Sequence, residues 1–305
     1  MINFLRLNFV GVILLSNIIS ACSSGSEVTD NTDKDTTVIH VDSLQKYPKS
    51  GEIKILSFNV RQATNEQVAS NNWDFRKVAC VDMIEDQKPT VIGLQEAVYS
   101  SQWTYLKEQL DSDYDGYGVG RDDGATSGET MGILWKKSDV EKLKTGTFWL
   151  SDSPDTPSKG WGGQYNRCVT WGLFKIKATG QIFVYMNTHL ELSESVRSKE
   201  MALIIKKFAE LNTDHYPQFF SADCNATSGD TIFNHFKNTM ASARENASHT
   251  DYNNTYNGWG DGTGLIDNIF YSKNLTAVEY HTITESYDST TYLSDHYPIY
   301  TIIRF

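Results

Sequence analysis

The stretch Leu293-Ser294-Asp295-His296-Tyr297-Pro298 is followed by an apolar run, Ile299 to Phe305, that is typical of a buried strand. Asp295 offers a carboxylate to a hard metal ion, and His296 is suited to moving protons near neutral pH. Taken alone, such a pair is more often a solvated surface feature. Neighbouring side chains of a regular strand face opposite ways. We therefore expect both residues in the loop that enters the last strand, with Pro298 at the sheet margin.

Upstream of this stretch, strand-like and helix-like segments alternate. Runs rich in β-branched and aromatic residues predict strands at 53–60, 91–94, 131–135, 169–176, 182–186, 219–220, 266–271, 278–283 and 297–303. Helices are predicted at 75–84, 103–110 and 196–211. The prediction of the first helix depends on the spacing of Phe75, Val78, Val81 and Ile84, which suggests one face of a helix. Pro89 is expected to end this helix. Nearly continuous apolar strands imply sheets covered on both faces, so one α/β domain from about 51 to 305 is the simplest interpretation.

Polar residues follow or interrupt several of these runs. They are Asn59, Gln95-Glu96, Asn187-Thr188-His189-Leu190, Asp223-Cys224-Asn225 and Asp267. Each one alone is more simply a turn or cap residue. Ligands of open α/β sheets bind outside strand ends, so side chains placed there can share one cleft. Together with the Asp-His pair near the end of the chain, they predict a common site.

The order and spacing of these segments resemble the endonuclease/exonuclease/phosphatase superfamily, the deoxyribonuclease-like metal phosphoesterases, over nearly all of residues 51–305. Further matching segments are Gly118 to Gly124, Gly128-Glu129 and Gly146 to Ser151, which resemble a branch found in many exported bacterial proteins. The resemblance implies a four-layer α/β sandwich, in which two packed mixed β-sheets are flanked by helices.

The resemblance also implies a metal site. Glu96 would be the main metal ligand, with Asn59 and Asp295 completing or orienting the metal shell. Carboxylate and amide oxygens suit Mg²⁺ or Mn²⁺, which keep water ligands and bind phosphate oxygens.

The chemical roles that the resemblance implies fall on four further residues. Asp223 would position or deprotonate the attacking water, and Asn225 would hold a phosphate oxygen. His189 and His296 would donate to the phosphoryl oxygens as negative charge shifts in the transition state.

Each of these histidines needs a carboxylate that fixes its tautomer and keeps it protonated. We expect Asp267 to serve His296 and Glu129 to serve His189. The alternative for both carboxylates is the surface, which is the usual place of Asp and Glu.

Substrate contacts are expected from arginines and tryptophans. Arg61, Arg121 and Arg167 are candidates to clamp a phosphate bidentately. Trp161 and Trp259, in glycine-rich loops, are candidates to stack on a base or sugar. The alternative is that the arginines are structural and the tryptophans pack their own loops.

Residues 1–22 are typical of an export signal. Arg6 gives a positive start, Val10 to Leu15 are apolar, and Cys22 follows small residues in a pattern that resembles the lipobox of a bacterial lipoprotein. The implied mature protein begins at a lipidated Cys22 and is membrane-anchored, facing the periplasm or the cell surface. The alternative is cleavage near Ala21 and a free secreted protein.

The remaining sequence features are consistent with an exported protein. Residues 23–50 are polar and acidic without periodicity, and are expected to form a flexible tether. Cys80, Cys168 and Cys224 cannot all pair, so at most one disulfide forms among them, and their spacing fits no zinc pattern. The formal net charge of −11 disfavours tight, non-specific binding to a polyanion unless metal ions intervene.

These features favour a metal-dependent phosphoester hydrolase in which water attacks phosphorus in line. The sequence leaves open a phosphomonoester, a phosphodiester lipid headgroup or a nucleic acid as substrate, and the acidic charge favours a small or lipid-linked phosphoester. A nuclease acting on DNA or RNA is the alternative. A catalytically inactive, membrane-tethered binding protein is the alternative of another class, and the complete set of polar residues argues against it. No protein partner is implied.

Overall fold

Two six-stranded mixed sheets pack face to face in the computed structural model, which describes residues 44–305. In spatial order, the first sheet contains β13 (Thr276–Thr282), β14 (Ile299–Arg304), β1 (Glu52–Asn59), β2 (Val91–Gln95), β6 (Ile133–Lys136) and β4 (Tyr114–Tyr117). The second contains β11 (Met240–Ser242), β12 (Asp267–Ser272), β10 (Gln218–Asp223), β9 (Ile182–His189), β8 (Cys168–Ile176) and β7 (Val140–Trp149). A small ribbon of β3 (Ala97–Val98) and β5 (Glu129–Thr130) lies apart from both.

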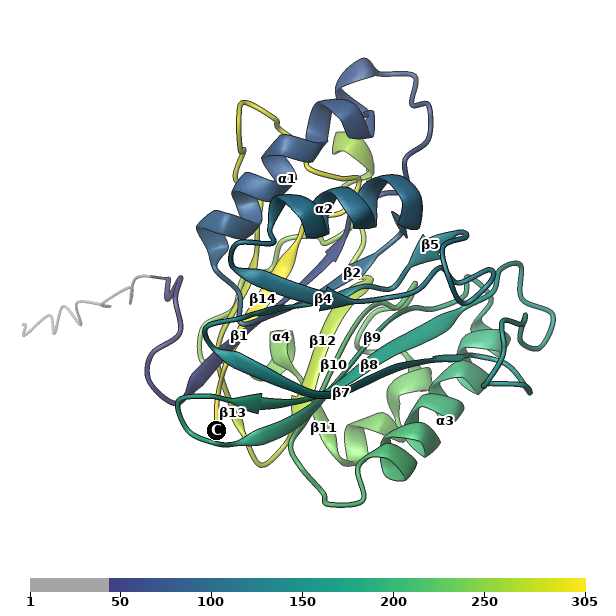
Figure 1. Cartoon of the computed structure of the whole chain (residues 1–305), viewed down its shortest axis with the longest axis vertical. Coiled ribbons are helices and arrows are strands. Elements are labelled where there is room, and N and C mark those ends of the chain that lie inside the picture. The colour runs from purple at the N-terminus through teal and green to yellow at the C-terminus, as the bar shows by residue number, and fades with distance from the viewer. Residues whose placement is uncertain (1–43) are drawn as a thin grey trace, which may run out of the picture. The chain divides into compact units, whose positions relative to one another are not determined.

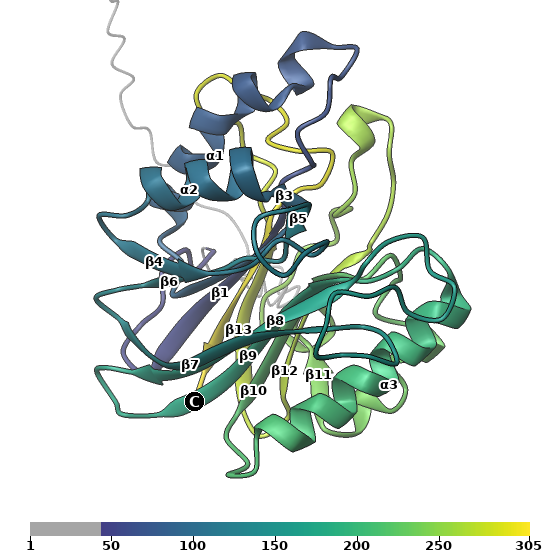
Figure 2. The same ribbon diagram turned by 45° about the vertical axis from the view of Figure 1, so that its right-hand side comes forward.

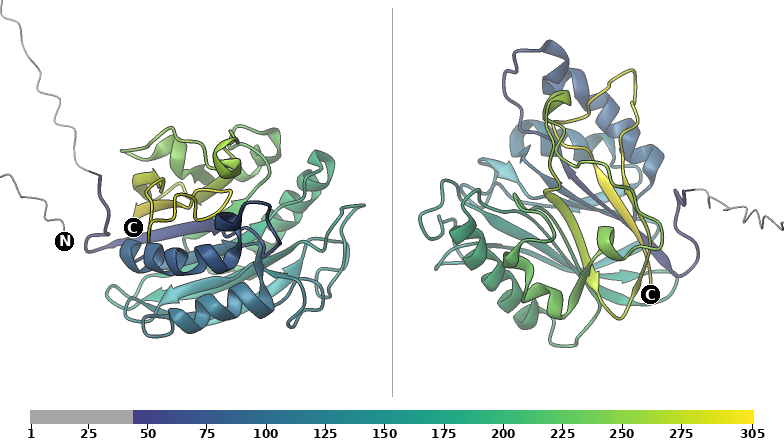
Figure 3. Two further views of the ribbon diagram at one scale, coloured as in Figure 1. Left: turned by 90° about the horizontal axis from the view of Figure 1, so that it is seen from above. Right: turned by 180° about the vertical axis from the view of Figure 1, so that it is seen from behind.

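Helices cover the outer faces of both sheets. Figures 1 and 2 show α1 (Trp73–Gln87) and α2 (Thr104–Gln109) over the first sheet, and α3 (Glu194–Leu211) over the second. The short α4 (Ala243–Asn246) precedes β12. This four-layer sandwich is the architecture predicted from the sequence. Seen from behind, in Figure 3, the yellow final strand β14 runs beside β1, with which it pairs antiparallel.

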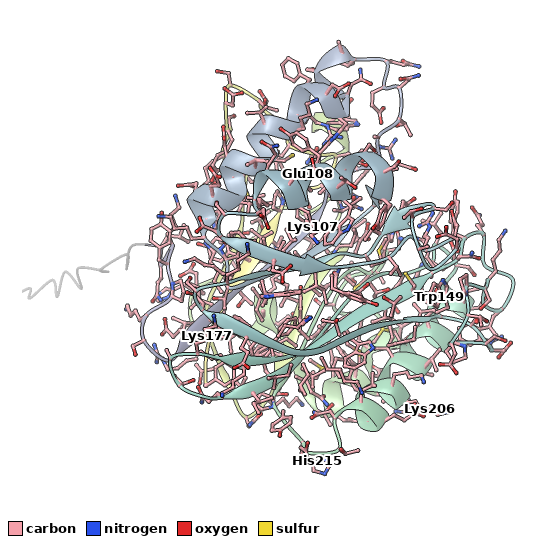
Figure 4. All side chains as sticks on the ribbon, viewed as in Figure 1. Lys107, Glu108, Trp149, Lys177, Lys206 and His215 are labelled. Carbon is pink, nitrogen blue, oxygen red and sulfur yellow. The ribbon has the colours of Figure 1, made fainter. Side chains whose placement is uncertain are left out.

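Each helix buries an apolar stripe and leaves charge outside. Leu106 of α2 and Ile204 of α3 are buried in the cores beneath their helices. Glu108 of α2 and Lys206 of α3 are exposed (Figure 4). Among residues 44–305, none of the helices combines the length and the apolar character needed to cross a membrane.

The central core lies between the two sheets and is rich in aromatic side chains. Phe183 of β9 contacts Phe174 and Phe219, with ring centroids 5.6 and 5.4 Å apart. Ile55 of β1 and Val91 of β2 belong to the same core from the first sheet. Burying each such side chain contributes about 1.5–3 kcal/mol, so this layer holds the two sheets together.

A buried polar bridge crosses this apolar layer near the strand ends. The Gln95 side-chain amide of β2 donates to Oδ1 of Asn187 in β9 over 2.7 Å. The Asn187 amide donates back to the carbonyl oxygens of Leu94 and Gly132, at 2.8 and 3.0 Å. Each donor of the bridge has an acceptor, so the bridge fixes the relative position of the sheets, and Oε1 of Gln95 is its one atom without a hydrogen-bond partner among the described residues.

Gly93, in β2, allows the sheets to approach at this bridge. A Cβ atom built on Gly93 would lie 2.4 Å from Oδ1 of Asn187, Oγ of Ser221 and the hydroxyl of Tyr185. No side chain fits there, so the spacing between β2 and the second sheet depends on glycine at this position.

The predicted apolar face of the first helix is wrong in part. Phe75 and Val78 of α1 are 54% and 45% exposed, whereas Val81 and Ile84 are buried as predicted. Three residues advance a helix about 60° short of a full turn, so four positions spaced by three spread around half of it. The buried face instead includes the side chain of Arg76, which donates to the carbonyl oxygen of Val60.

Residues just before the expected boundary, at about residue 51, also contact the compact unit. Nζ of Lys46 contacts Asp86 at 2.6 Å, and the hydroxyl of Tyr300 donates to the carbonyl oxygen of Gln45 over 3.4 Å. The compact unit therefore begins before residue 51, and the last part of the predicted tether belongs to it. The export signal, Cys22 and the remaining part of the tether, 23–43, lie outside the described residues.

Candidate active site

Strand register brings the predicted site residues to one edge of the sandwich. Parallel pairing of β9 with β10 places His189 beside Asp223, and antiparallel pairing of β10 with β12 places Asp267 on its other side. In the first sheet, parallel pairing of β1 with β2 places Asn59 beside the residue that precedes Glu96. His189 and Asp223 end their strands, since β9 and β10 extend further than the sequence predicted.

These strand ends open into a cleft of about 420 Å³. Its lining includes ten residues expected at the site: Arg61, Glu96, Arg121, Glu129, Arg167, His189, Asp223, Asn225, Asp295 and His296. Asn59 and Asp267 lie behind the lining and hydrogen-bond to it. Trp259 is not part of it; its ring lies against the guanidinium of Arg76, at 5.2 Å. Trp161 donates instead to Asp152 over 2.8 Å.

The amide of Asn59 joins two carboxylates. Its nitrogen donates to Oε1 of Glu96 over 3.0 Å and to Oδ2 of Asp223 over 2.9 Å. Its oxygen accepts the backbone N–H of Arg61. Oε2 of Glu96 accepts the backbone N–H of Gln62 over 3.0 Å. Asn59 therefore turns donors, not its oxygen, toward the carboxylates, and it fixes their separation.

Three residues of the cleft have left-handed backbone conformations. The φ angles are 55° at Arg61, 59° at Glu96 and 47° at Asn225. Such conformations are costly for residues other than glycine, and they persist where surrounding contacts fix them, often at functional sites. The hydrogen bonds around Asn59 supply that constraint for two of the three.

Asp295 and His296 lie in the loop before β14, as predicted. Oδ2 of Asp295 is 3.6 Å from Arg61, and Oδ1 accepts the hydroxyl of Ser294. Its backbone carbonyl accepts two further N–H groups, which fixes the loop. Burial raises the pKa of Asp295 with help from the charge of Glu96, against the opposing charges of His296 and Arg61.

His296 pairs with Asp267, as expected. Its Nδ1 is 2.8 Å from Oδ2 of Asp267, and its Nε2 is 3.6 Å from Oδ2 of Asp223. Burial alone would lower the pKa of His296, but the charges of Asp267 and Asp223 outweigh it and raise the pKa to about 10. His296 is therefore an imidazolium at neutral pH, with its Nε2–H on the side of Asp223.

His189 has the opposite character. Burial, then the charges of Arg167, Arg121 and His296, lower its pKa well below the ordinary value, so the ring is neutral. Nε2 lies 3.1 Å from the amide nitrogen of Asn225, which also donates to the backbone. Nε2 therefore accepts, and the proton is on Nδ1, which has no hydrogen-bond partner within residues 44–305.

The predicted contact between Glu129 and His189 is wrong. Glu129 accepts a hydrogen bond from Nη1 of Arg121 over 2.6 Å, and Nδ1 of His189 is 4.0 Å from Oε1 of Glu96 instead. A guanidinium forms a charge-assisted bond to a carboxylate that a neutral imidazole does not match. Burial raises the pKa of Glu129 to about 7, against the lowering effect of Arg121.

Asp223 is the point where these groups meet. Its Oδ2 accepts from Asn59 and lies 3.5 and 3.6 Å from Nε2 of His189 and of His296. Its Oδ1 accepts the backbone N–H of Asn225 over 3.0 Å. Burial raises the pKa of Asp223, and His296 opposes that rise. A buried carboxylate of raised pKa between two imidazoles is suited to accept a proton from a water molecule.

The donor set includes two groups compact enough to hold a metal ion. Ligand atoms of Glu96, His189 and Asp223 all lie within 4.8 Å of one another, and so do those of Asp223, Asp267 and His296. In the second group the imidazolium of His296 is committed to Asp267. The first group, with Asp295 in the same cleft lining, is the better candidate, because Glu96 accepts only neutral N–H groups from Asn59 and Gln62 and its oxygens keep lone pairs for a hard ion.

Sequence reasoning missed two aromatic residues of the cleft. Tyr165 lies between Arg121 and Arg167, and Tyr256 packs edge-on against His296 with ring centroids 5.1 Å apart. Neither tyrosine is at a strand end, so the pattern used to find the site gave no signal for them.

The cysteines take no part in the site. Cys80, Cys168 and Cys224 are buried and unpaired, so no disulfide forms among the described residues. Cys224, between two site residues, packs into the apolar core under α3, as expected for the middle residue of that segment.

Comparison with known proteins agrees with this geometry. The sequence profile of the Endonuclease/Exonuclease/phosphatase family matches residues 56–296. An endonuclease/exonuclease/phosphatase from Bacteroides vulgatus is 31% identical, with 83% of this chain and 99% of that chain covered and a TM-score of 0.77. A mannosyl-6-phosphatase from Bacteroides thetaiotaomicron is 29% identical, with 83% and 100% covered and a TM-score of 0.78.

Two further proteins are similar to this chain, one in structure and one in sequence. The human nocturnin catalytic domain shares the fold, at 17% identity, 85% and 96% coverage and a TM-score of 0.67. An uncharacterized protein of Acanthamoeba polyphaga mimivirus is 28% identical over 165 residues, which are 50% of this chain and 59% of that protein. The match thus spans about three fifths of the length of this curated relative.

Proposed function

The chain belongs to the endonuclease/exonuclease/phosphatase family of phosphoester hydrolases, and from that membership we propose that it hydrolyses the phosphate ester of a small or lipid-linked alcohol, using a divalent metal ion. The observation that carries the proposal is the convergence of Asn59, His189 and His296 on Oδ2 of Asp223. The similar mannosyl-6-phosphatase makes sugar phosphates the first substrates to test.

Asp223 is the proposed base of the reaction. Its raised pKa brings it closer to neutral pH, where a general base works best. The hydrogen bonds from Asn59 and from the backbone of Asn225 hold its two oxygens in place. Asp223 would take a proton from the water that attacks phosphorus on the side opposite the leaving alcohol.

The carboxylate oxygens of the cleft are suitable ligands for a hard divalent ion. Glu96 and Asp295 offer carboxylate oxygens, and Asn59 orients Glu96 through its amide nitrogen. We propose that Glu96 and Asp295 hold Mg²⁺ or Mn²⁺, ions that prefer oxygen ligands. When bound, such an ion supplies a Lewis acid that draws negative charge from a phosphoryl oxygen.

Two side chains are proposed to donate to the phosphoryl group. His296 carries a positive charge because Asp267 stabilises its imidazolium, so its Nε2–H is a charged donor. His189 offers Nδ1–H, which no acceptor of the described chain occupies. Asn225 lines the cleft as well, but the two N–H groups of its side chain are taken by His189 and by the carbonyl oxygen of Leu190, so its role here is to orient the His189 ring. Donors fixed in advance stabilise charge that develops in the transition state.

The test is phosphate release by the full chain from sugar phosphates, phospholipid headgroup esters and nucleotides. We expect turnover with Mg²⁺ or Mn²⁺, its loss in EDTA, and a fall of at least about 100-fold in Asp223→Ala or His296→Ala. His281→Gln is the matched control, because His281 also pairs with a carboxylate but lies outside the cleft. Full activity in either site variant would contradict the proposed roles.

Nuclease activity is the alternative use of the same site. The acidic balance of the chain disfavours binding of a long polyanion. Single- and double-stranded DNA and RNA belong in the same panel, and faster cleavage of any of them than of every small ester would replace the proposed substrate class.

The N-terminal pattern supports a further proposal about location. We propose that the mature chain is anchored to a membrane by a lipid on Cys22, through the tether that follows. The site would then act on substrate at the periplasmic or outer surface.

A further inference from the structure

Arg167 is buried in the wall of the cleft and lacks partners for its donors. Its side chain is 4% exposed, and neither Nε nor Nη1 has a hydrogen-bond partner within residues 44–305. The nearest carboxylate oxygen, Oε2 of Glu191, is 3.8 Å from Nε. That oxygen already accepts the backbone N–H groups of Gln164 and Tyr165, at 2.9 and 3.2 Å. A buried guanidinium with unpaired N–H groups is costly unless a ligand supplies the acceptors.

Arg121 is placed in the same way on the same wall. It is 6% exposed, one arm is fixed by Glu129, and its Nε has no hydrogen-bond partner in the described chain. Both guanidiniums lie against the ring of Tyr165, at 5.0 and 5.1 Å from its centroid. Tyr165 itself is 44% exposed and lines the cleft with both arginines. We call Arg121, Arg167 and Tyr165 the arginine wall.

The arginine wall belongs to the pocket of the reacting group. It lines the same cleft as His189, Asn225 and His296. The charges of Arg167 and Arg121 both act on the imidazole of His189, whose Nδ1 is a further unpaired donor. Unpaired donors of Arg121, Arg167 and His189 therefore belong to residues of one cleft lining.

We propose that the arginine wall recognises the terminal, doubly charged phosphate of a monoester, and so makes the enzyme a phosphomonoesterase. The inference rests on the proposed function and narrows its substrate class. A monoester presents three non-bridging oxygens and up to two charges, whereas a diester presents two such oxygens and one charge. In a diester the third position is an uncharged ester oxygen that carries a substituent, so the arginine donors would remain buried and unpaired. A site built to hydrogen-bond one group rejects an analogue that lacks it.

The test compares two esters with the same leaving group, p-nitrophenyl phosphate and bis(p-nitrophenyl) phosphate, in Mg²⁺ with the full chain. The wild type is expected to favour the monoester by kcat/KM. Arg167→Met should lower kcat/KM for the monoester about 100-fold and for the diester less than about 3-fold, because the lost bonds are charge-assisted. Inhibition by inorganic phosphate, the product with the same oxygens, should weaken in parallel.

Two further variants make the result specific. Arg167→Lys keeps the charge without the planar fork, so an intermediate loss is expected, and it serves as the test if the methionine variant does not fold. Arg197→Lys is the matched control, because Arg197 is also buried but donates to the carbonyl oxygens of Glu191 and Leu192 and does not line the cleft. Its monoester-to-diester ratio should equal that of the wild type.

The outcomes separate this inference from the function it rests on. If the wild type hydrolyses neither ester nor any other phosphoester, the proposed function fails. If it hydrolyses the diester as well as the monoester, or if Arg167→Met lowers both equally, only the role of the arginine wall fails. A further outcome is that Arg167→Met lowers kcat/KM only for substrates with a second anionic group, for example for fructose 1,6-bisphosphate but not for fructose 6-phosphate. That result would also overturn the role of the arginine wall, because the wall would then bind the alcohol portion of the substrate.

Discussion

The two histidines of the cleft differ in charge although each lies near Oδ2 of Asp223. His296 has a carboxylate, Asp267, on its Nδ1, whereas His189 has an amide on Nε2 and guanidiniums nearby. A hydrogen-bonded carboxylate on Nδ1, which His296 has and His189 lacks, therefore distinguishes the charged histidine from the neutral one. The fold thus places one charged and one neutral imidazole in the same cleft.

The charge on His296 predicts a pH dependence. Its pKa of about 10 keeps the ring charged at neutral pH, so activity should persist through neutral pH and fall as pH rises through about 10. Asp267→Asn removes the main stabilising charge, so the pKa of His296 should fall and this alkaline limb should move to lower pH. Turnover at pH 7 should drop about 100-fold. The measurement is a kcat–pH profile from pH 5 to 11.

Asp251→Asn is the control for that profile. Asp251 pairs with His281 at 3.1 Å, outside the cleft, so its removal should leave the alkaline limb in place. An unchanged limb in Asp267→Asn would mean that Asp267 does not set the charge of His296.

His281 predicts a pH dependence of stability instead of activity. Burial would lower its pKa, but the hydrogen bonds that His281 donates to the carboxylates of Asp251 and Glu285 outweigh this and raise it from 6.5 to about 9. Because the pKa of His281 is raised in the folded state, its protonation stabilises the folded protein. The stabilisation is fully present at pH values below the unfolded pKa of 6.5, and it is lost as pH rises through about 9. His281→Gln should therefore lose about 1–2 kcal/mol at pH 6 and almost nothing at pH 10. Urea midpoints at both values measure this, and equal losses at the two pH values would refute the ion pair.

At the scale of elements, strand ends place the catalytic groups and the sheet spacing sets their separation. β9, β10 and β12 carry His189, Asp223 and Asp267 on one sheet, while β1 carries Asn59 on the other. The hydrogen bond from Asn59 to Asp223 crosses between the sheets. A change in sheet spacing should therefore alter the site before it unfolds the protein.

Gly93→Ala tests this link. The added methyl group would lie 2.4 Å from three polar atoms of the second sheet, so the sheets must separate. The free energy of unfolding should fall by about 1–3 kcal/mol, and kcat should fall more than the folded fraction explains. Gly229→Ala is the control, since only Oγ1 of Thr227, at 3.8 Å, is near its Cβ position. A variant with wild-type kcat and urea midpoint would show that spacing at Gly93 does not matter.

The same elements explain how much of the molecule the sequence predicts. Apolar runs locate the buried strands, and the polar residues after them locate most of the cleft, because strand ends of one sheet must share an edge. The partner of Glu129 is not encoded locally. It depends on Arg121 reaching it across a turn, so spacing alone suggested the wrong contact with His189. Tyr165 is not predicted as a cleft residue for the same reason, since only its contacts with two arginines give it a role.

For the whole chain, both the N-terminal pattern and the acidic charge are consistent with the proposed substrate. A net charge of −11 and a cleft of about 420 Å³ suit a small charged ester better than a long polyanion. A lipid on Cys22 would hold that cleft at a membrane surface.

Cys22→Ala tests the anchor. With the thiol that accepts the lipid removed, we expect the full chain to leave the membrane fraction when it is expressed in a bacterium, while hydrolytic activity persists in whichever fraction holds the protein. Fractionation and the mass of the mature N-terminus measure this. Equal membrane retention of the variant and the wild type, or a wild-type mass without a lipid, would contradict the lipoprotein proposal.

In the proposed reaction, water attacks phosphorus in a metal-dependent step that Asp223 assists. The most direct measurement is hydrolysis of a sugar phosphate by the full chain in ¹⁸O-labelled water, with Mg²⁺, with EDTA and with Asp223→Asn. We expect that ¹⁸O appears in the released phosphate, that EDTA abolishes release, and that Asp223→Asn lowers kcat at least about 100-fold. Label in the alcohol, or wild-type turnover by Asp223→Asn, would contradict the proposed reaction.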